Sequence, residues 1–334
     1  MKIIGFEEHY MLPAIAEANP NSPRKLFDVA RDGGGWPPPG IHDLGEGRIA
    51  AMDAAGIDVQ ILSNVPGAEA VELARQANDA VVAAVTQHPD RFRGFATLPM
   101  RDPSAAAAEL ERTVRDHSFV GALINGHVNG RYLDDTFFWP VFESAETLGV
   151  PIYLHPTVPP QPVIDACYRG FAPAVSAKLS IAGMGWHIDT GIHCIRLILG
   201  GVFDRFPGLQ IIVGHHFEAL SWMAWRTDYS FPVEESGLKR TIKEYLRENF
   251  YGGILAGEFA NQEPGGPDPS WSLSFNAYQA MVNVIGIDRI VFTTDYPFAS
   301  MKAGRQFLDQ MPIPPADKEK IGHLNAERLL RLSN

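Results

Sequence analysis

The chain contains 334 residues, of which 46% are hydrophobic, and it carries a formal net charge of -11 at pH 7. This apolar content supports a large folded core and excludes a disordered chain. The sequence has no run of like charge and no basic stripe that could follow a phosphate backbone, so we expect no nucleic-acid partner.

The sequence also contains no segment typical of membrane insertion or of a disulfide framework. The N-terminus enters the apolar "KIIGFEEH" without a basic leader, and no apolar window approaches the roughly 18 residues that a membrane span needs. The two cysteines, Cys167 and Cys194, lie in unrelated contexts and form no metal motif. These features predict a cytoplasmic protein that has no membrane contact.

Eight short segments of strand length recur along the chain, and nearly all are rich in Ile, Val, Leu and Phe. They lie at residues 2–6, 59–63, 92–98, 120–124, 151–155, 209–214, 250–255 and 289–294. Continuous apolar runs are typical of parallel strands that are buried on both faces. Helical spacing at 70–89, 102–117 and 135–149 separates several of them. About eight such strand-helix units predict an α/β fold, the (β/α)8 TIM barrel.

A doubly wound open sheet is the alternative fold, although no glycine-rich phosphate motif follows the first strand. We expect a single domain over residues 1–334. Residues 11–45 and 256–276 are rich in Gly, Pro and aromatic residues, which predicts two long insertion loops. Such loops serve as lids near an active-site mouth or as surface and subunit contacts, and both interpretations stay open.

Polar side chains with metal-binding or acid-base chemistry stand at the carboxyl ends of several predicted strands. They are Glu7, His9, His155, His215, His216 and Asp295. In a barrel these ends converge on one face, where active sites are built. Each residue alone is equally explained as a satisfied polar group, and their joint placement favours a site.

The spacing of Glu7 and His9 supports a metal site, because residues two apart on a strand point the same way. Glu8, between them, is expected to point away and to serve as a structural ion-pair partner. Imidazole and carboxylate ligands suit a divalent transition ion, and we expect zinc, with manganese as the alternative.

The motifs "EEH", "YLHP", "GHHFE" and "TDYP", with "MDAAGIDVQILS" and "FVGALINGH", resemble the amidohydrolase superfamily over essentially the whole chain. Within it the chain is similar to the decarboxylase branch, which includes γ-resorcylate, 2,3-dihydroxybenzoate and aminocarboxymuconate-semialdehyde decarboxylases. Many hydrolytic members begin with His-X-His, whereas Glu7 takes the first position here. The segment "INGHV" lacks the bridging ligand of binuclear members, which implies one metal ion.

The resemblance implies that Glu7, His9, His155 and Asp295 bind the metal, that His215 is the active-site histidine, and that Glu218 pairs with it. The implied reaction is non-oxidative decarboxylation of an ortho-hydroxybenzoate-type aromatic acid. Asp295 is expected to protonate the ring carbon with help from His215, while Glu218 orients that imidazole. The family usually reads Gly-His-Met-Gly-Glu where this chain has "GHHFE", so His216 and Phe217 add bulk. Either this bulk reshapes the pocket for a different ring, or His216 packs beneath the barrel rim.

Five further residues follow predicted strands or start a helix, and they are candidates for substrate contact: Asn125, His127, Trp186, His187 and Arg226. For Arg226, an ion pair within the fold is an equal alternative. Two other functions remain open. One is a metal-dependent hydrolase of a lactone, amide or ester, and the other is a barrel without catalysis that serves in binding or assembly. The resemblance also implies a homodimer or homotetramer.

Overall fold

The computed structural model describes residues 1–18, 29–30, 37–255 and 270–332. Nine parallel strands form one sheet in the order β3-β2-β1-β9-β8-β7-β6-β5-β4. The strands are β1 (Ile4–Tyr10), β2 (Val59–Asn64), β3 (Phe92–Gly94), β4 (Ala96–Thr97), β5 (Ala122–Asn125), β6 (Ile152–His155), β7 (Ile211–Val213), β8 (Phe250–Ile254) and β9 (Ile290–Thr293).

Strands β3 and β4 are separated by Phe95 alone, so they share one position in the sheet. The Phe95 N–H bonds the Leu62 carbonyl of β2, whereas the Ala96 N–H bonds the Gly121 carbonyl before β5. The sheet therefore closes into a barrel of eight positions, as predicted. The one difference is that the segment expected as a single strand at 92–98 is divided where it changes partners.

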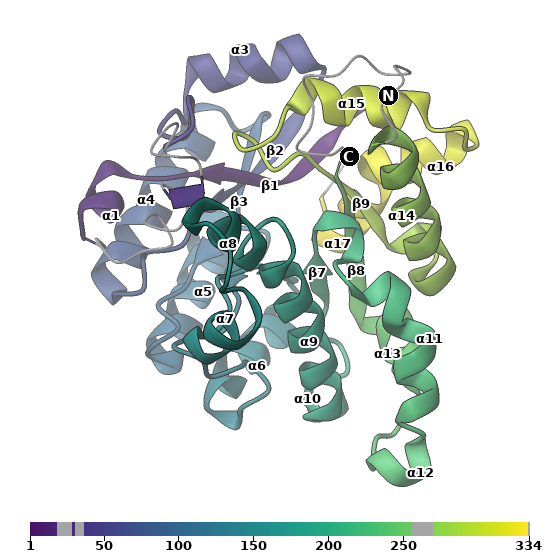
Figure 1. Cartoon of the computed structure of the whole chain (residues 1–334). Helices are drawn as coiled ribbons and strands as arrows, with labels where there is room; N and C mark the ends of the chain where they lie inside the picture. The colour runs from purple at the N-terminus through teal and green to yellow at the C-terminus, as the bar shows by residue number, and fades with distance from the viewer. Residues whose placement is uncertain (19–28, 31–36, 256–269, 333–334) are drawn as a thin grey trace.

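Helices surround the barrel in Figure 1. The longer ones are α3 (Glu46–Ala55), α4 (Val71–Gln87), α5 (Pro103–His117), α6 (Trp139–Leu148), α9 (Gly185–Leu199), α11 (Leu220–Ser230), α13 (Ile242–Asn249), α14 (Ser270–Ile285) and α15 (Met301–Gln310). The shorter ones are α1 (Pro13–Ala18), α7 (Gln161–Cys167), α8 (Pro173–Ser180), α10 (Val202–Arg205), α12 (Val233–Ser236), α16 (Pro315–Glu319) and α17 (Asn325–Leu330).

Local chemistry explains how several helices begin. The Asp102 side chain accepts a hydrogen bond from the Ala105 N–H, and Pro103 follows at the first turn of α5. Thr241 and Glu244 form a reciprocal capping box at the start of α13. The helices predicted at 70–89, 102–117 and 135–149 correspond to α4, α5 and α6, the last after a 3-10 turn at Thr136–Phe138.

Two apolar cores result from the closed sheet. The larger lies between barrel and helices, while the smaller contains alternate strand residues such as Phe6, Phe95 and Tyr153 and so fills the barrel interior. Leu329 and Leu330 of α17 join this interior cluster. The polar strand ends are left at the opposite, carboxyl end.

Within the two predicted insertion loops, residues 19–28, 31–36 and 256–269 lie outside the described part of the chain, and helix α1 occupies Pro13–Ala18 of the first. Helix α14 begins at Ser270, so the prediction of a loop up to residue 276 is wrong for its last seven residues. Ile41 is buried against Met11 and Val65, which fixes part of the first segment beside the ends of β1 and β2. Among the described helices, none combines the length and apolarity of a membrane span.

We expect Phe6→Ala to lower the free energy of unfolding by about 3–5 kcal/mol, because the closed barrel interior cannot collapse around the lost ring. Urea denaturation would measure the loss. Val71→Ala is the control, because Val71 is 51% exposed on α4. A loss at Phe6 no larger than at Val71 would contradict a packed barrel interior.

Candidate metal centre at the carboxyl end of the barrel

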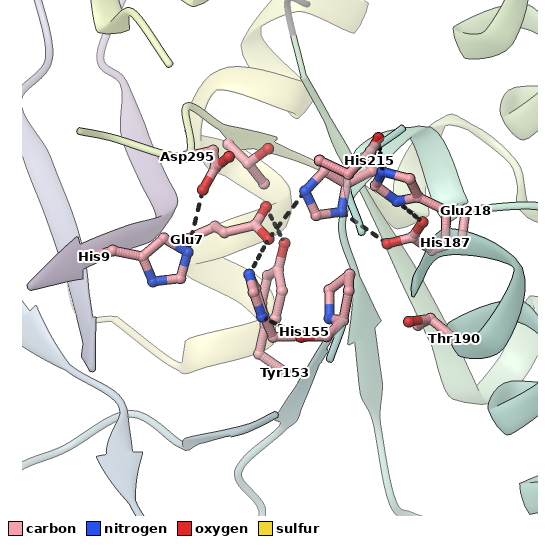
Figure 2. Close-up of polar contacts among 12 residues, drawn as sticks. Glu7, His9, Tyr153, His155, His187, Thr190, His215, Glu218 and Asp295 are labelled. Carbon is pink, nitrogen blue, oxygen red and sulfur yellow. Dashed lines mark hydrogen bonds and ion pairs between the residues drawn. The ribbon is translucent and has the colours of Figure 1, made fainter. Parts of the chain in front are cut away.

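Four buried side chains that can bind a metal meet at the carboxyl end of the barrel: Glu7, His9, His155 and Asp295. One donor atom from each lies within 4.8 Å of the others. His9 Nε2 is 3.2 Å from Asp295 Oδ1, and His155 Nε2 is 3.5 Å from Glu7 Oε1 (Figure 2). The structure thus brings together the four residues that the sequence singled out as ligands.

An irregularity in β1 places Glu7 on the inner side of the barrel. Strand alternation turns Phe6 inward and would turn Glu7 outward. Glu7 instead has a φ of 61°, and the pairing of β1 with β2 shifts register between Gly5 and Glu8. This bulge adds one inward residue, so Glu7 faces the interior and His9 follows it on the same side. Both residues lie within β1, although the sequence placed them just after the strand.

Glu8 points away from the cluster, as expected from its position between the two. Its carboxylate accepts hydrogen bonds from Gln60 Nε2 at 2.7 Å and from Thr294 Oγ1 at 2.7 Å. Complete burial raises its pKa to about 8, although the hydrogen bond from Thr294 and the positive charge of Arg48 both act to lower it. Glu8 is therefore held mainly by hydrogen bonds from Gln60 and Thr294, whereas we predicted an ion pair.

Both histidines of the cluster expose the same nitrogen to it. His155 Nδ1 is hydrogen-bonded to the Pro156 carbonyl at 2.8 Å, and His9 Nδ1 to the Ser63 hydroxyl at 3.3 Å. When Nδ1–H donates in both residues, both Nε2 lone pairs face the cluster. A metal ion requires this tautomer of its imidazole ligands.

The electrostatics of the cluster fit a divalent cation. Glu7 Oε1 and His9 Nε2 are buried and make no hydrogen bond. Burial raises the pKa of Glu7 to about 7, and burial together with the neighbouring His9 and His215 holds the pKa of His155 well below its usual value. A cation among these atoms would provide the missing partner and favour the ionised carboxylate. Two carboxylates and two imidazoles are a donor set that divalent transition ions accept.

The other oxygen of Glu7 is held by a residue that the sequence interpretation missed. The Tyr153 hydroxyl donates to Glu7 Oε2 at 2.6 Å. Its position two residues before His155 on β6 was the available signal, because such residues face the same side. Gly214 makes this contact possible, since a Cβ there would lie 2.5 Å from the tyrosine oxygen and 2.7 Å from Glu7 Oε2.

A second cluster adjoins the first and consists of His215, Glu218 and His187 (Figure 2). Glu218 Oε1 is 2.7 Å from His215 Nδ1, and Glu218 Oε2 is 2.5 Å from His187 Nδ1. His215 Nε2 is 3.6 Å from Glu7 Oε1, which joins the two clusters. Burial disfavours the protonated form of His215, but the carboxylates of Glu7 and Glu218 outweigh it, and its pKa is raised well above the usual value.

The backbone at both clusters adopts left-handed conformations that L-residues rarely take. Residues 215–218 all have positive φ, and so does Asp295 at 55°. With Glu7, these are six of the nine non-glycine residues with positive φ in the described chain. Each costs on the order of 1–3 kcal/mol, and such strain concentrates at functional sites.

Two predicted substrate contacts, Asn125 and His127, line a cavity of about 330 Å³ beside the ends of β2, β4 and β5. Asn125 Oδ1 is buried without a hydrogen-bond partner. Both ring nitrogens of His127 are engaged, because Nε2 bonds the Val158 carbonyl at 3.1 Å and the Gly130 N–H donates to Nδ1 at 3.0 Å. His127 therefore shapes the wall of the cavity by fixing local backbone.

The remaining predicted contacts differ in position. The ring of Trp186 lies 6.4 Å from that of His155, at the edge of the cluster, and its indole N–H donates to His187. Arg226 is exposed on α11 with its guanidinium 4.6 Å from the Trp225 ring, so its described contact is outside the site.

His216 turns its ring toward Phe307, 6.0 Å away, and its two nitrogens are buried without hydrogen-bond partners.

The chain, a barrel with a cluster of candidate metal ligands at its strand ends, belongs to the amidohydrolase family, whose model matches residues 27–332. The chain is 37% identical over 313 residues to γ-resorcylate decarboxylase of Polaromonas sp., covering 88% of this chain and 89% of that protein.

Two solved structures are similar in fold and sequence. Dihydroxybenzoic acid decarboxylase of Polaromonas sp., with manganese and 2-nitroresorcinol bound, has a TM-score of 0.81 at 32% identity and covers 100% of this chain and 98% of its own. 5-Carboxyvanillate decarboxylase of Novosphingobium aromaticivorans, with manganese and 4-hydroxy-3-methoxy-5-nitrobenzoic acid, has a TM-score of 0.81 at 31% identity, covering 99% and 96%.

Loss of a residue that only hydrogen-bonds to a metal ligand lowers metal affinity by roughly 10- to 100-fold. We expect Glu7→Gln to weaken the binding of a divalent ion by more than this, because Glu7 is itself a proposed ligand. Glu8→Gln is the matched control and keeps the affinity, because that adjacent carboxylate faces away. The metal-free wild type should bind more weakly as pH falls through about 7, since protons then compete for Glu7.

Elemental analysis after chelation and reloading, with a titration at several pH values, would measure these affinities. Equal losses in the two variants would remove Glu7 from the metal centre.

Proposed function

We propose that the protein is a metal-dependent, non-oxidative decarboxylase of an ortho-hydroxybenzoate-type aromatic acid. The observation that carries the proposal is the buried four-ligand cluster with a second, proton-handling cluster 3.6 Å from it. The decarboxylases that resemble this chain over nearly its whole length support the same chemistry.

Glu7, His9, His155 and Asp295 would hold one divalent ion. That ion supplies positive charge for the substrate carboxylate and its ortho oxygen, which fixes the aromatic ring in the site. Manganese is favoured for this chain, because both related structures described above contain it. Zinc, the ion expected from the sequence, has no support from these two relatives.

The reaction needs one proton delivered to the ring carbon that bears the carboxylate. Protonation interrupts aromaticity, the bond to the carboxylate then breaks, and carbon dioxide leaves as the ring recovers its electrons. In this proposal Asp295 donates the proton, after taking it up from the phenol or when the substrate arrives. His215 assists through Nε2, which faces Glu7, while Glu218 fixes the opposite nitrogen.

A hydrolase of a lactone, amide or ester would use the same ligands, with Asp295 as the base. Its product would be a ring-opened acid or a cleaved ester instead of carbon dioxide and an arene. The named relatives favour decarboxylation, and the fate of one proton separates the two reactions.

We expect incubation with a panel of ortho-hydroxybenzoates in deuterated water to place a single deuterium where the carboxylate had been, as measured by mass spectrometry and NMR. His215→Asn should slow this step by about 10²- to 10⁴-fold and keep the metal. Asp295→Asn should lose both metal and activity. An inert panel, together with opening of a lactone or amide by the wild type, would establish the hydrolase instead.

We further propose that the chain forms a homodimer or homotetramer through α11. Trp222, Trp225 and Tyr229 lie on one face of this helix and are 61%, 66% and 79% exposed. Arg226 stacks on Trp225 in the same helix. Trp, Tyr and Arg are enriched at the centres of protein interfaces. In a two-fold symmetric contact the same surface of both subunits packs together, so this face of α11 would be buried against the same face of a second copy.

We expect the double variant Trp225→Glu with Tyr229→Glu to sediment as a monomer at concentrations where the wild type is an oligomer, because two carboxylates would be buried in the contact. Val71→Glu, a change at an exposed apolar residue of α4, should leave the oligomer intact. A monomeric wild type would contradict the proposal.

A further inference from the structure

His187 was expected to contact substrate, but both of its ring nitrogens are engaged within the protein. Nδ1 lies 2.5 Å from Glu218 Oε2. Nε2 lies 3.0 Å from the Trp186 indole nitrogen, which donates to it, and 3.1 Å from the Ala182 carbonyl. In this arrangement no ring nitrogen of His187 is left for a ligand. Its role must therefore be sought in what it holds.

His187 holds a carboxylate that has no access to water. The Glu218 side chain is 0% exposed, and the two hydrogen bonds described for its carboxylate come from Nδ1 of His215 and Nδ1 of His187, one to each oxygen. An ionised carboxylate only accepts hydrogen bonds, so both imidazoles donate to it. Two donors on different oxygens fix the carboxylate plane, which one donor alone would leave free to rotate.

The orientation of Glu218 decides which nitrogen His215 presents to the metal cluster. With Nδ1–H directed at Glu218 Oε1, the ring of His215 turns Nε2 toward Glu7. His187 comes from α9, whereas Glu218 and His215 come from the turn after β7, so the second donor ties this left-handed turn to a separate helix. Loss of that donor would leave a buried oxygen unpaired.

We infer that His187 is a positioning residue, which donates Nδ1–H to Glu218 and thereby fixes the His215 imidazole in its reactive orientation. The inference rests on the proposed function for its kinetic consequence. It also changes the role expected for His187 from substrate binding to control of another histidine.

Two substitutions separate the nitrogens of His187. Asparagine places an N–H donor where Nδ1 lies, so His187→Asn keeps the bond to Glu218. Glutamine places its amide near Nε2, so His187→Gln keeps the contacts with Trp186 and Ala182 and loses the donor to Glu218. Because both side chains are polar and of similar size, the pair controls for folding, and His187→Leu removes both nitrogens.

With the metal-loaded variants and an ortho-hydroxybenzoate, we expect His187→Gln and His187→Leu to lose on the order of 10- to 100-fold in kcat with KM unchanged. His187→Asn should stay close to the wild type in both constants. All three should bind one metal ion per chain as the wild type does, because His187 is not among the four ligands.

A second readout does not depend on turnover. In the zinc-loaded wild type and in His187→Asn, the Nδ1 proton of His215 should give a slowly exchanging downfield NMR signal, which exchanges faster in His187→Gln. Assignment follows from its loss in His215→Asn.

The outcomes are distinct. Full activity in His187→Gln with loss in His187→Asn would overturn the inference and assign His187 to holding the start of α9. A rise in KM alone in all three variants would restore the substrate contact and also overturn it. A wild type without decarboxylation would refute the proposed function, while the NMR comparison would still test the positioning role.

Discussion

Burial of the Glu7 carboxylate inside the barrel is the constraint on which the rest of the site depends. A buried carboxylate without compensation costs several kcal/mol, and the Glu7 side chain is 0% exposed. The Tyr153 hydroxyl satisfies one oxygen, while the other faces His155 and His215 at 3.5 and 3.6 Å. Only one carboxylate oxygen of Glu7 therefore accepts a hydrogen bond. A cation beside the other, Oε1, would offset the remaining cost of burying the charge, which explains why the cluster suits a metal ion.

The backbone near Glu7 follows from the same constraint. The bulge in β1 turns Glu7 inward, and Gly214 leaves room for the tyrosine and the carboxylate to meet. The left-handed turn after β7 places His215 Nε2 3.6 Å from Glu7 Oε1. Such conformations are unfavourable alone, and they persist because closed strand pairing and the packed interior around Phe6 hold the strand ends in place.

The two clusters divide the chemistry while sharing one carboxylate. Under the proposed function, the first would hold the metal ion that fixes an aromatic acid, and the second contains imidazoles hydrogen-bonded to Glu218. Glu7 belongs to the first cluster and lies 3.6 Å from His215 of the second, so one side chain links the proposed metal ligands to the proposed proton-handling histidine. His187 extends this link to α9, because it occupies the second oxygen of Glu218.

The sequence by itself predicted the barrel and the polar residues at its strand ends, and the family resemblance selected the four of them that meet in the candidate metal centre. Continuous apolar strands are a local property, and closure of a parallel barrel forces polar strand ends such as His155 to converge. Tertiary structure alone decided which atoms meet. The inward turn of Glu7 depends on a bulge in β1. The pairing of Glu218 with His187 depends on contact between α9 and the turn after β7, and the local sequence of neither element predicts that contact. For the same reason the exposed position of Arg226 could not be predicted: strand-end proximity in sequence does not fix the direction in which a helix turns its side chains.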